Sequence, residues 1–396
     1  MAKRPGPVEI QQSHELPDCQ RLLRDLGQIR VLWIWCPTAH SKQRLIDGLA
    51  ADGWSVSNML DLSLSVVISE HTLLRFAEVL ETFLTPQELV LTKMVGTPDS
   101  HLGPEHLGQF QTAQAFAARC KARWVFRLLA DDQYATWYQP LVAAQPGPGG
   151  RQTVFGHEAL FRLNREGAAV SPQRLFETAA QAGLCSALDL FARRSALRHV
   201  GTLARQGPIF INFDLCGFAD PDHGLRSTLA LMAELGLTPD QIVFEVTESA
   251  VPGESAHLVS VLQAYRQAGF RIALDDVGAE YSGLTLLQAL RPEFIKIDKA
   301  LIKDIARDRY RQNLVTHLIQ AGRANGVTVV AEGVETAEDC NWLIAHQADL
   351  LQGFLFGHPA PQIQTPLPEA QPAKLSFGTD WIDAFGAVHG PDMIVV

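Results

Sequence analysis

Six segments beyond residue 150 end in, or contain, side chains that can bind a metal ion or work as an acid or base. Each segment reads as a strand candidate in a chain where helices and strands alternate. In a barrel of parallel strands, the carboxyl ends gather at one mouth, where catalytic residues lie. The polar residues in question are Glu158, Asn212, Glu245, Asp275, Asp276, Lys296 and Glu332. Oxygen-rich clusters of this kind hold hard divalent cations such as Mg2+ or Mn2+.

Glu158, Leu160 and Arg162 occupy every second position of a predicted strand. Their side chains therefore point to one face of that strand. The carboxylate can bind a metal ion, and the guanidinium can hold a phosphate oxygen with its fork of donors. A motif this short, taken alone, is more typical of an ion pair on a surface-facing strand.

Asp275 and Asp276 stand side by side at the end of another predicted strand. Adjacent residues of a regular strand face opposite sides, so both can reach one site only where the strand breaks. Val277-Gly278 is predicted to supply that break. The pair could then serve two metal ions, which clamp the attacking and leaving oxygens in phosphoryl transfer. The alternative is a pair of Asp residues capping a helix.

Lys296 and Asp298 are predicted to place two charges on one strand face. A buried lysine there would orient a water molecule or stabilise negative charge, unless it forms an interior salt bridge. Glu332 follows an apolar run, precedes a glycine and is a candidate general base. Its alternative is an interior carboxylate paired with Lys or Arg. Glu335 is predicted to be more exposed and to contact substrate or cap the next helix.

The strands that carry these residues alternate with predicted helices over about 230 residues, which favours a closed (β/α)8 barrel. The first two strands, at 138–144 and ending in Glu158, are predicted to pair as a hairpin, so that one strand near the start is antiparallel. The runner-up is an open doubly wound sheet. No Gly-x-Gly-x-x-Gly phosphate loop is present to support a dinucleotide site in such a sheet.

The front of the chain is predicted to form a smaller α/β domain over residues 29–105. Its predicted strands and helices cover 29–35, 41–51, 62–68, 71–84 and 88–94. A receiver domain is disfavoured, because Cys36-Pro37 stands where that fold needs an acidic pair. We expect a regulatory or dimerising role. The remaining divisions are a flexible start (1–28), a linker helix (106–133), the barrel (134–365) and a tail (366–396).

Bulk properties exclude several classes of protein. The chain has 396 residues and a formal net charge of −10. Without Lys/Arg clusters, such a chain is a poor candidate for binding duplex nucleic acid. No apolar stretch approaches the roughly 20 residues needed to cross a bilayer. The six cysteines are scattered, which argues against a disulfide scaffold or a zinc site. We therefore expect a cytoplasmic protein with no membrane association.

Taken together, the motifs resemble the EAL family, named for its Glu-Ala-Leu motif, over about residues 134–362. The matching segments are Tyr138-Gln139-Pro140, Glu158-Ala159-Leu160-x-Arg162, Ile211-Asn212, Glu245-x-x-Glu248, Asp275-Asp276-x-Gly278, Lys296-x-Asp298, Glu332-x-x-Glu335 and Gln352-Gly353. They occur in the family's order. Active members of this family are phosphodiesterases that linearise cyclic di-GMP to pGpG with Mg2+ or Mn2+.

The resemblance implies a role for each matching position. Two metal ions would be bound by Glu158, Asn212, Glu245, Asp275 and Asp276. Lys296 would orient the attacking water, and Glu332 would act as general base or as a metal-linked carboxylate. Substrate contacts would come from Gln139, Leu160, Arg162, Gln352 and Glu335. Glu248 would steady the loop after Asp276, and the barrel would form a homodimer.

One segment departs from the family pattern. The family reads Asp-Asp-Phe-Gly-Thr-Gly-Tyr-Ser where this chain has Val277 in place of the aromatic residue and Glu280 in place of a glycine. Glycine adopts backbone angles that Glu adopts only with strain. The leading hypothesis is an active phosphodiesterase, since every expected ligand is present. The alternatives are a weak or inactive receptor for cyclic di-GMP that uses the same pocket, and a scaffold that acts through protein contacts of the front domain.

Overall fold

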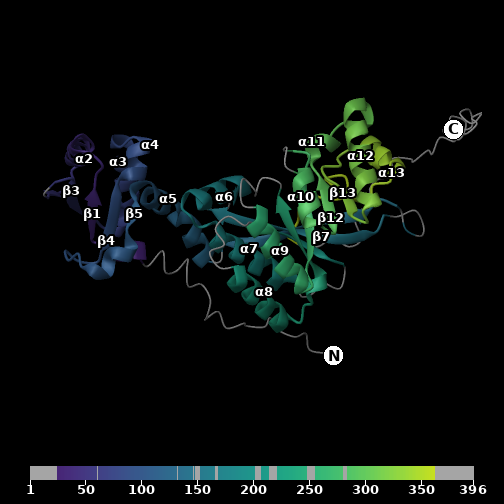
Figure 1. Ribbon diagram of the computed structural model, residues 1–396, viewed down its shortest axis with the longest axis horizontal. Coiled ribbons are helices and arrows are strands. Elements are labelled where there is room, and N and C mark those ends of the chain that lie inside the picture. The colour runs from purple at the N-terminus through teal and green to yellow at the C-terminus, as the bar shows by residue number, and fades with distance from the viewer. Residues whose placement is uncertain are drawn as a thin grey trace, which may run out of the picture.

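The computed structural model shows two units joined by one helix, α5 (Ala113–Ala130) (Figure 1). It describes residues 25–59, 61–131, 133–145, 147, 152–165, 168–200, 207–213, 221–247, 255–279 and 283–361. Among the helices in these ranges, none combines the length and the apolar character that crossing a membrane requires.

Eight strands close the larger unit into a barrel. Their order around it is β6-β14-β13-β12-β11-β10-β9-β7, and β7 pairs with β6 to complete the circle. β6 is antiparallel to both neighbours, and the other seven strands run parallel. The predicted barrel with one antiparallel strand near its start is confirmed. The strands are β6 (Tyr134–Ala143), β7 (Val154–Arg165), β9 (Ile209–Asn212), β10 (Ile242–Thr247), β11 (Arg271–Val277), β12 (Phe294–Ile297), β13 (Thr328–Ala331) and β14 (Leu350–Gln352).

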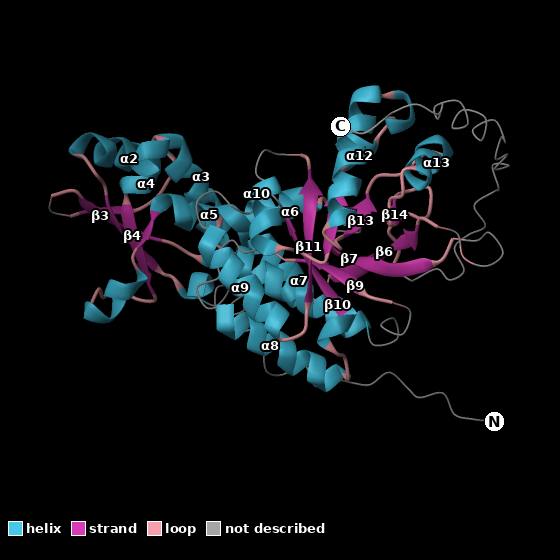
Figure 2. Cartoon of the chain, turned by 45° about the vertical axis from the view of Figure 1, so that its right-hand side comes forward, coloured by secondary structure: helices cyan, strands magenta, loops and turns pink. Residues whose placement is uncertain are grey.

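Helices cover the outside of this barrel (Figure 2). Outward-facing strand residues such as Ile211, Phe244 and Val329 are buried in one continuous apolar core together with helix residues such as Leu262 and Ile319. The helices are α6 (Pro172–Gln181), α7 (Cys185–Val200), α8 (Pro221–Leu235), α9 (Ser255–Gln267), α10 (Gly283–Leu290), α11 (Lys299–Ile302), α12 (Arg309–Ala324) and α13 (Ala337–Ala345). A short strand, β8 (Ala168–Val170), extends the β7 edge.

The front unit contains a five-stranded antiparallel sheet, ordered β2-β3-β1-β4-β5. The first four strands of this unit and the two longer helices between them follow the order strand-helix-strand-strand-helix-strand, which is the split βαβ arrangement of ferredoxin-like domains. A receiver domain has a parallel sheet, so this topology excludes it. The elements are β1 (Val31–Trp35), α2 (Ala39–Ala51), β2 (Val56–Asn58), β3 (Ser63–Val67), α3 (Leu73–Phe83), α4 (Pro86–Leu91), β4 (Lys93–Thr97) and β5 (Gln111–Thr112).

Three predicted elements of the front unit differ in the structure. The predicted strand at 88–94 is mostly helix α4, because Thr85 and Glu88 form a capping box and Pro86 fits the first helical turn. The predicted linker helix at 106–133 instead holds a 3-10 helix, β5 and α5. The predicted flexible start extends too far, since residues 25–28 are helical and Leu26 is buried in the front core. The tail at 366–396 and residues 1–24 lie outside the described residues.

Helix α5 belongs to both units at once. Its first half contributes Phe116 and Cys120 to the apolar core of the front sheet. Its second half contributes Val125 and Phe126 to a different cluster, shared with α6, α7 and strand β7. Because both halves are packed, α5 fixes the front unit to the barrel strand that carries Glu158.

We expect Phe126→Ala to lower the free energy of unfolding by about 3–5 kcal/mol, the usual cost of truncating a fully buried aromatic residue. Phe126 has no exposed surface. Urea denaturation followed by tryptophan fluorescence measures the change. Leu107→Ala is the control, because Leu107 is 69% exposed. Equal effects of the two variants would contradict the packing assigned to α5.

Candidate active site

The barrel interior is built from two layers of side chains. The lower layer is an apolar plug with one residue from each strand: Leu141, Phe155, Phe210, Val243, Ala273, Phe294, Val330 and Leu350. Side chains two positions apart on a strand share a face. The upper layer therefore follows from the plug along each strand: Gln139, Glu158, Asn212, Glu245, Asp275, Lys296, Glu332 and Gln352.

Six of these eight strands place the polar residue two positions after the plug residue, as in Phe210 and Asn212. Strand β6 runs the other way, so Gln139 precedes Leu141. Strand β7 needs three positions from Phe155 to Glu158, because a bulge shifts its register against β6 between Leu141 and Val142. The predicted convergence of strand-end residues at one mouth is thus present in the structure.

The ammonium group of Lys296 lies among the carboxylates. Its Nζ is 2.5 Å from Glu332 Oε1 and 2.7 Å from Glu245 Oε1. Asp275 Oδ1 follows at 3.3 Å and Glu158 Oε2 at 3.7 Å. Lys296 is only 1% exposed. One positive charge therefore faces four carboxylates in a buried site, and surplus buried charge is costly unless further cations or protons compensate it.

The pKa values of the carboxylates reflect this excess of buried negative charge. Burial raises the pKa of Glu332 to about 8, with the carboxylates of Asp275 and Glu158 adding to it against Lys296. Burial and the adjacent Asp275 raise the pKa of Asp276 to about 6. Burial likewise raises the pKa of Glu245 well above its ordinary value. Without added cations, part of this site holds protons, which a bound metal ion would displace.

Glu158 behaves differently from its neighbours. Burial acts to raise its pKa, but Lys296 and two hydrogen bonds outweigh burial, so the pKa of Glu158 is lowered. Gln352 Nε2 donates to Glu158 Oε2 at 2.6 Å, and Asn212 Nδ2 donates to Oε1 at 3.2 Å. Glu158 is thus held as a carboxylate in a fixed orientation, which suits a metal ligand.

Asp275 and Asp276 reach the same space because the backbone turns at Asp276. Its φ is 57°, in the left-handed region, which Asp tolerates better than most residues. The pairing of β11 with β12 shifts register between Leu274 and Val277, so a bulge re-aims the side chain. The predicted break at Val277-Gly278 is therefore one residue late. Val277 is buried and still pairs with Ile297.

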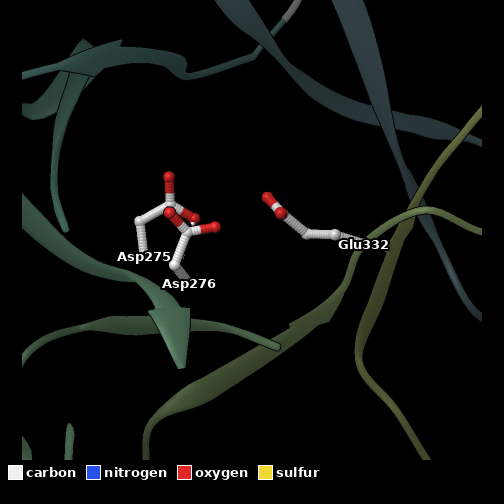
Figure 3. A group of neighbouring side chains, drawn as sticks. All are labelled: Asp275, Asp276 and Glu332. Carbon is white, nitrogen blue, oxygen red and sulfur yellow. Dashed lines mark hydrogen bonds between the residues drawn. The ribbon is translucent and has the colours of Figure 1, made fainter. Parts of the chain in front are cut away.

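The donor set fits a divalent metal. Carboxylate oxygens of Asp275, Asp276 and Glu332 lie within 4.8 Å of one another and point into one space (Figure 3). Neither carboxylate oxygen of the buried Glu245 has a hydrogen-bond donor at a suitable angle, although Lys296 forms an ion pair with it. Oxygen ligands and excess negative charge suit Mg2+ or Mn2+ rather than a thiol-binding metal.

Asp298 does not share a strand face with Lys296, contrary to the prediction. Strand β12 ends at Ile297, and the Asp298 side chain caps α11 by accepting a bond from the Ala300 amide at 2.8 Å. The negative charge of Asp298 also contributes to the raised pKa of Asp276. The sequence signal for this role was the Asp at a helix start.

The residues predicted to contact substrate fall into two groups. Gln139 and Gln352 are buried beside Glu158, and the Gln352 Nε2 group also lies 3.4 Å from Gln139 Oε1. Leu160 and Arg162 are half-buried further out along β7.

Two further predicted positions are Glu335 and Glu248. Glu335 is exposed. The helix-capping alternative considered for it is wrong, because Thr336 caps α13. Glu248, together with Glu280 in the divergent loop, lies outside the described residues.

Sequence reasoning passed over Trp137. Its ring lies under the Arg162 guanidinium, with 5.8 Å between the Arg162 Cζ atom and the ring centroid. Strand β6 was predicted only from Tyr138 onward, whereas it starts at Tyr134. Cross-strand pairing of β6 with β7 was the signal that could have placed Trp137 next to the Glu-Ala-Leu motif.

A sequence profile described as "EAL domain" matches residues 122–359. The chain belongs to the EAL-domain family. Among curated relatives, a probable cyclic di-GMP phosphodiesterase of Escherichia coli, PdeB, is 33% identical over 235 residues, which cover 57% of this chain and 42% of PdeB. MucR of Pseudomonas aeruginosa, a bifunctional diguanylate cyclase/cyclic di-GMP phosphodiesterase, is 30% identical over 59% of this chain and 34% of MucR. This chain thus spans less than half the length of either relative.

Solved structures agree with this family assignment. The PaMucR phosphodiesterase in its c-di-GMP complex has a TM-score of 0.54 and 28% identity, covering 60% of this chain and 96% of that one. A standalone EAL protein of Vibrio cholerae O395 in its c-di-GMP-bound form has a TM-score of 0.53 and 26% identity, covering 60% and 97%. Both comparisons concern the EAL barrel.

The raised pKa values predict how stability of the metal-free protein changes with pH. The pKa of Glu332 is about 8 in the folded protein and near 4.5 when unfolded, so between these values the folded state binds more protons. We expect the melting temperature, measured by scanning calorimetry after chelation, to fall from pH 6.5 to 8.5. For one proton, the free energy of unfolding falls by up to about 1.4 kcal/mol per pH unit.

Added Mn2+ should reverse this trend, because deprotonated carboxylates bind it better. The window avoids His157, whose pKa burial lowers to about 4 and whose effect on stability ends near pH 6.5. Glu332→Gln is the control and should flatten the profile of the chelated protein. A melting temperature that rises with pH in this window would contradict the assignment.

Proposed function

We propose that this chain is a metal-dependent phosphodiesterase that hydrolyses cyclic di-GMP to pGpG. The observation that carries the proposal is the ring of carboxylates around Lys296 at the carboxyl ends of the EAL barrel strands. Relatives with names or structures that specify cyclic di-GMP supply the substrate. The geometry supports phosphodiester chemistry, since such a substrate is anionic and needs positive charge beside it.

Two metal ions would be held by Glu158, Asn212, Glu245, Asp275 and Asp276. The bulge at Asp276 supports this number, because it lets adjacent carboxylates face one space from different directions. When bound, the ions would neutralise the phosphodiester and lower the pKa of a water molecule. Glu158 would be the most constant ligand, since Gln352 and Asn212 hold it in one orientation.

The chain's own residues would handle the proton and the attacking water. Glu332, which lies beside Lys296 and would be deprotonated with metal bound, would accept the proton from the water. Lys296 would fix that carboxylate and the water between it and the phosphorus. The water oxygen forms the new bond to phosphorus, the bond from phosphorus to the ribose 3′ oxygen breaks, and that oxygen takes a proton from solvent water. The products are a 5′ phosphate and a 3′ hydroxyl, as in pGpG.

The assay is incubation of the purified chain with cyclic di-GMP and Mn2+, followed by chromatography for pGpG. Formation of pGpG, lost on chelation, supports the proposal. Binding of cyclic di-GMP without turnover would instead support the receptor hypothesis, which the replaced residues Val277 and Glu280 favour. If the chain showed neither binding nor turnover, the remaining hypothesis would be a scaffold that acts through the front unit.

The front domain and the barrel surface would have roles beyond catalysis. The packing of α5 on both units supports a regulatory role for the front domain, because movement there would reach strand β7. Homodimer formation through the barrel stays a prediction that sedimentation velocity can test.

A further inference from the structure

The hairpin of β6 and β7 forms a ribbon that leads from the carboxylates outward. In an antiparallel pair, directly opposite residues share a face. Gln139 lies opposite Glu158, and Trp137 lies opposite Leu160. Arg162 is two positions further along β7. The face that starts at the proposed metal site therefore continues through an indole ring and a leucine to a guanidinium.

Arg162 and Trp137 are diagonal neighbours on this face, and they are in contact. The Arg162 Cζ atom lies 5.8 Å from the centroid of the Trp137 ring, over its face. Arg162 Nη1 also donates to the carbonyl of Phe161 at 3.0 Å. Trp gives the strongest cation–π contact of the three aromatic residues, and the contact strengthens when the cation is partly desolvated. Burial does lower the pKa of the Arg162 guanidinium, which indicates such desolvation.

Packing of the opposite face of the ribbon prevents the ribbon from rotating. Phe161 and Leu163 point away from the mouth into the cluster shared with α5, α6 and α7. Tyr134 stacks on Phe161 with centroids 5.9 Å apart and meets Phe191 edge-on at 4.7 Å. Because these residues are packed, Trp137 and Arg162 keep their place relative to Glu158.

We propose that Trp137 is a positioning residue that holds the Arg162 guanidinium against the non-reacting half of a cyclic dinucleotide. This inference rests on the proposed function. At about 3.4 Å per residue, the backbones of Glu158 and Arg162 are about 14 Å apart along β7. Glu158 attracts the Arg162 guanidinium, but no carboxylate of the described residues forms a salt bridge with it, so the guanidinium can take an anion of the substrate. A second phosphate on the same molecule gives the guanidinium an oxygen to bind.

The test compares two substrates in Trp137→Leu, which keeps apolar bulk but removes the ring face. With cyclic di-GMP, we expect kcat/KM to fall by about 3- to 20-fold, mostly through KM. With bis(p-nitrophenyl) phosphate, a small diester that does not extend along the ribbon, kcat/KM should stay within about twofold. Trp137→Phe should lie between wild type and Trp137→Leu with cyclic di-GMP. Trp35→Leu, a matched change in the front unit, should affect neither substrate.

A double variant tests whether Trp137 acts through Arg162. In the Arg162→Ala background, Trp137→Leu should cause little further loss with cyclic di-GMP, because the contact is already absent. An equal fall for both substrates, or losses that add in the double variant, would overturn the proposal in favour of a purely structural role. Wild-type protein that cleaves the small diester but not cyclic di-GMP would refute the proposed substrate instead. If the wild-type protein cleaved neither cyclic di-GMP nor the small diester, the proposed function would be refuted.

Discussion

Replacing Lys296 with methionine is expected to reduce pGpG formation at saturating Mn2+ by at least about 100-fold, the loss typical of removing one preorganised charge from an active site. Lys296 Nζ lies within 4 Å of four carboxylates and only 2.5 Å from the proposed base Glu332. Methionine replaces most of the aliphatic part of the side chain but leaves those carboxylates without their ammonium partner. Glu332 would then hold its proton more tightly and orient water less well.

The same substitution should also destabilise the chelated protein, because an uncompensated buried charge costs about 3–5 kcal/mol unless protons take it up. Lys303→Met is the matched control, since Lys303 is exposed on the barrel surface. Steady-state kinetics and calorimetry on both variants separate the two effects. If Lys296→Met retained wild-type kcat, Lys296 would be only a filler of the interior and the proposed proton path would fail.

Glu158→Gln is expected to weaken Mn2+ binding by more than about 100-fold and to remove measurable turnover. Substitutions of residues behind a metal ligand already cost 10- to 100-fold in affinity, so loss of a ligand should cost more. The change is nearly isosteric but puts an NH2 group where Gln352 and Asn212 already donate. Donor would meet donor at one of these contacts, and the remaining oxygen carries no full charge for the metal.

Isothermal titration with Mn2+ and chromatography for pGpG measure the two effects of Glu158→Gln. Glu338→Gln provides the control, because Glu338 is exposed and pairs with Arg307 away from the mouth. Wild-type metal affinity in Glu158→Gln would show that the Glu158 carboxylate is not a ligand. Normal Mn2+ affinity together with lost turnover would mean that Glu158 orients the substrate and does not bind the metal.

The barrel and most of its site could be predicted because both depend on short-range periodicity. An apolar residue and a polar residue two positions later, as in Phe210 and Asn212 or Phe294 and Lys296, share one strand face whatever the rest of the chain does. Six such segments separated by helices, together with the preceding strand pair, leave few ways to bury their apolar sides other than a closed barrel. The identity of the layer above the plug was therefore contained in the sequence.

Tertiary structure alone decided how those side chains meet. The bulges at Phe155 and Asp276 depend on pairing with β6 and β12, which lie elsewhere in the sequence. The position of Lys296 among the carboxylates depends on barrel closure, as does the contact of Trp137 with Arg162. Local sequence sets the period of a strand, but the register between strands is fixed by which side chains pack across them. That packing involves residues far apart in the chain, and no single segment carries it.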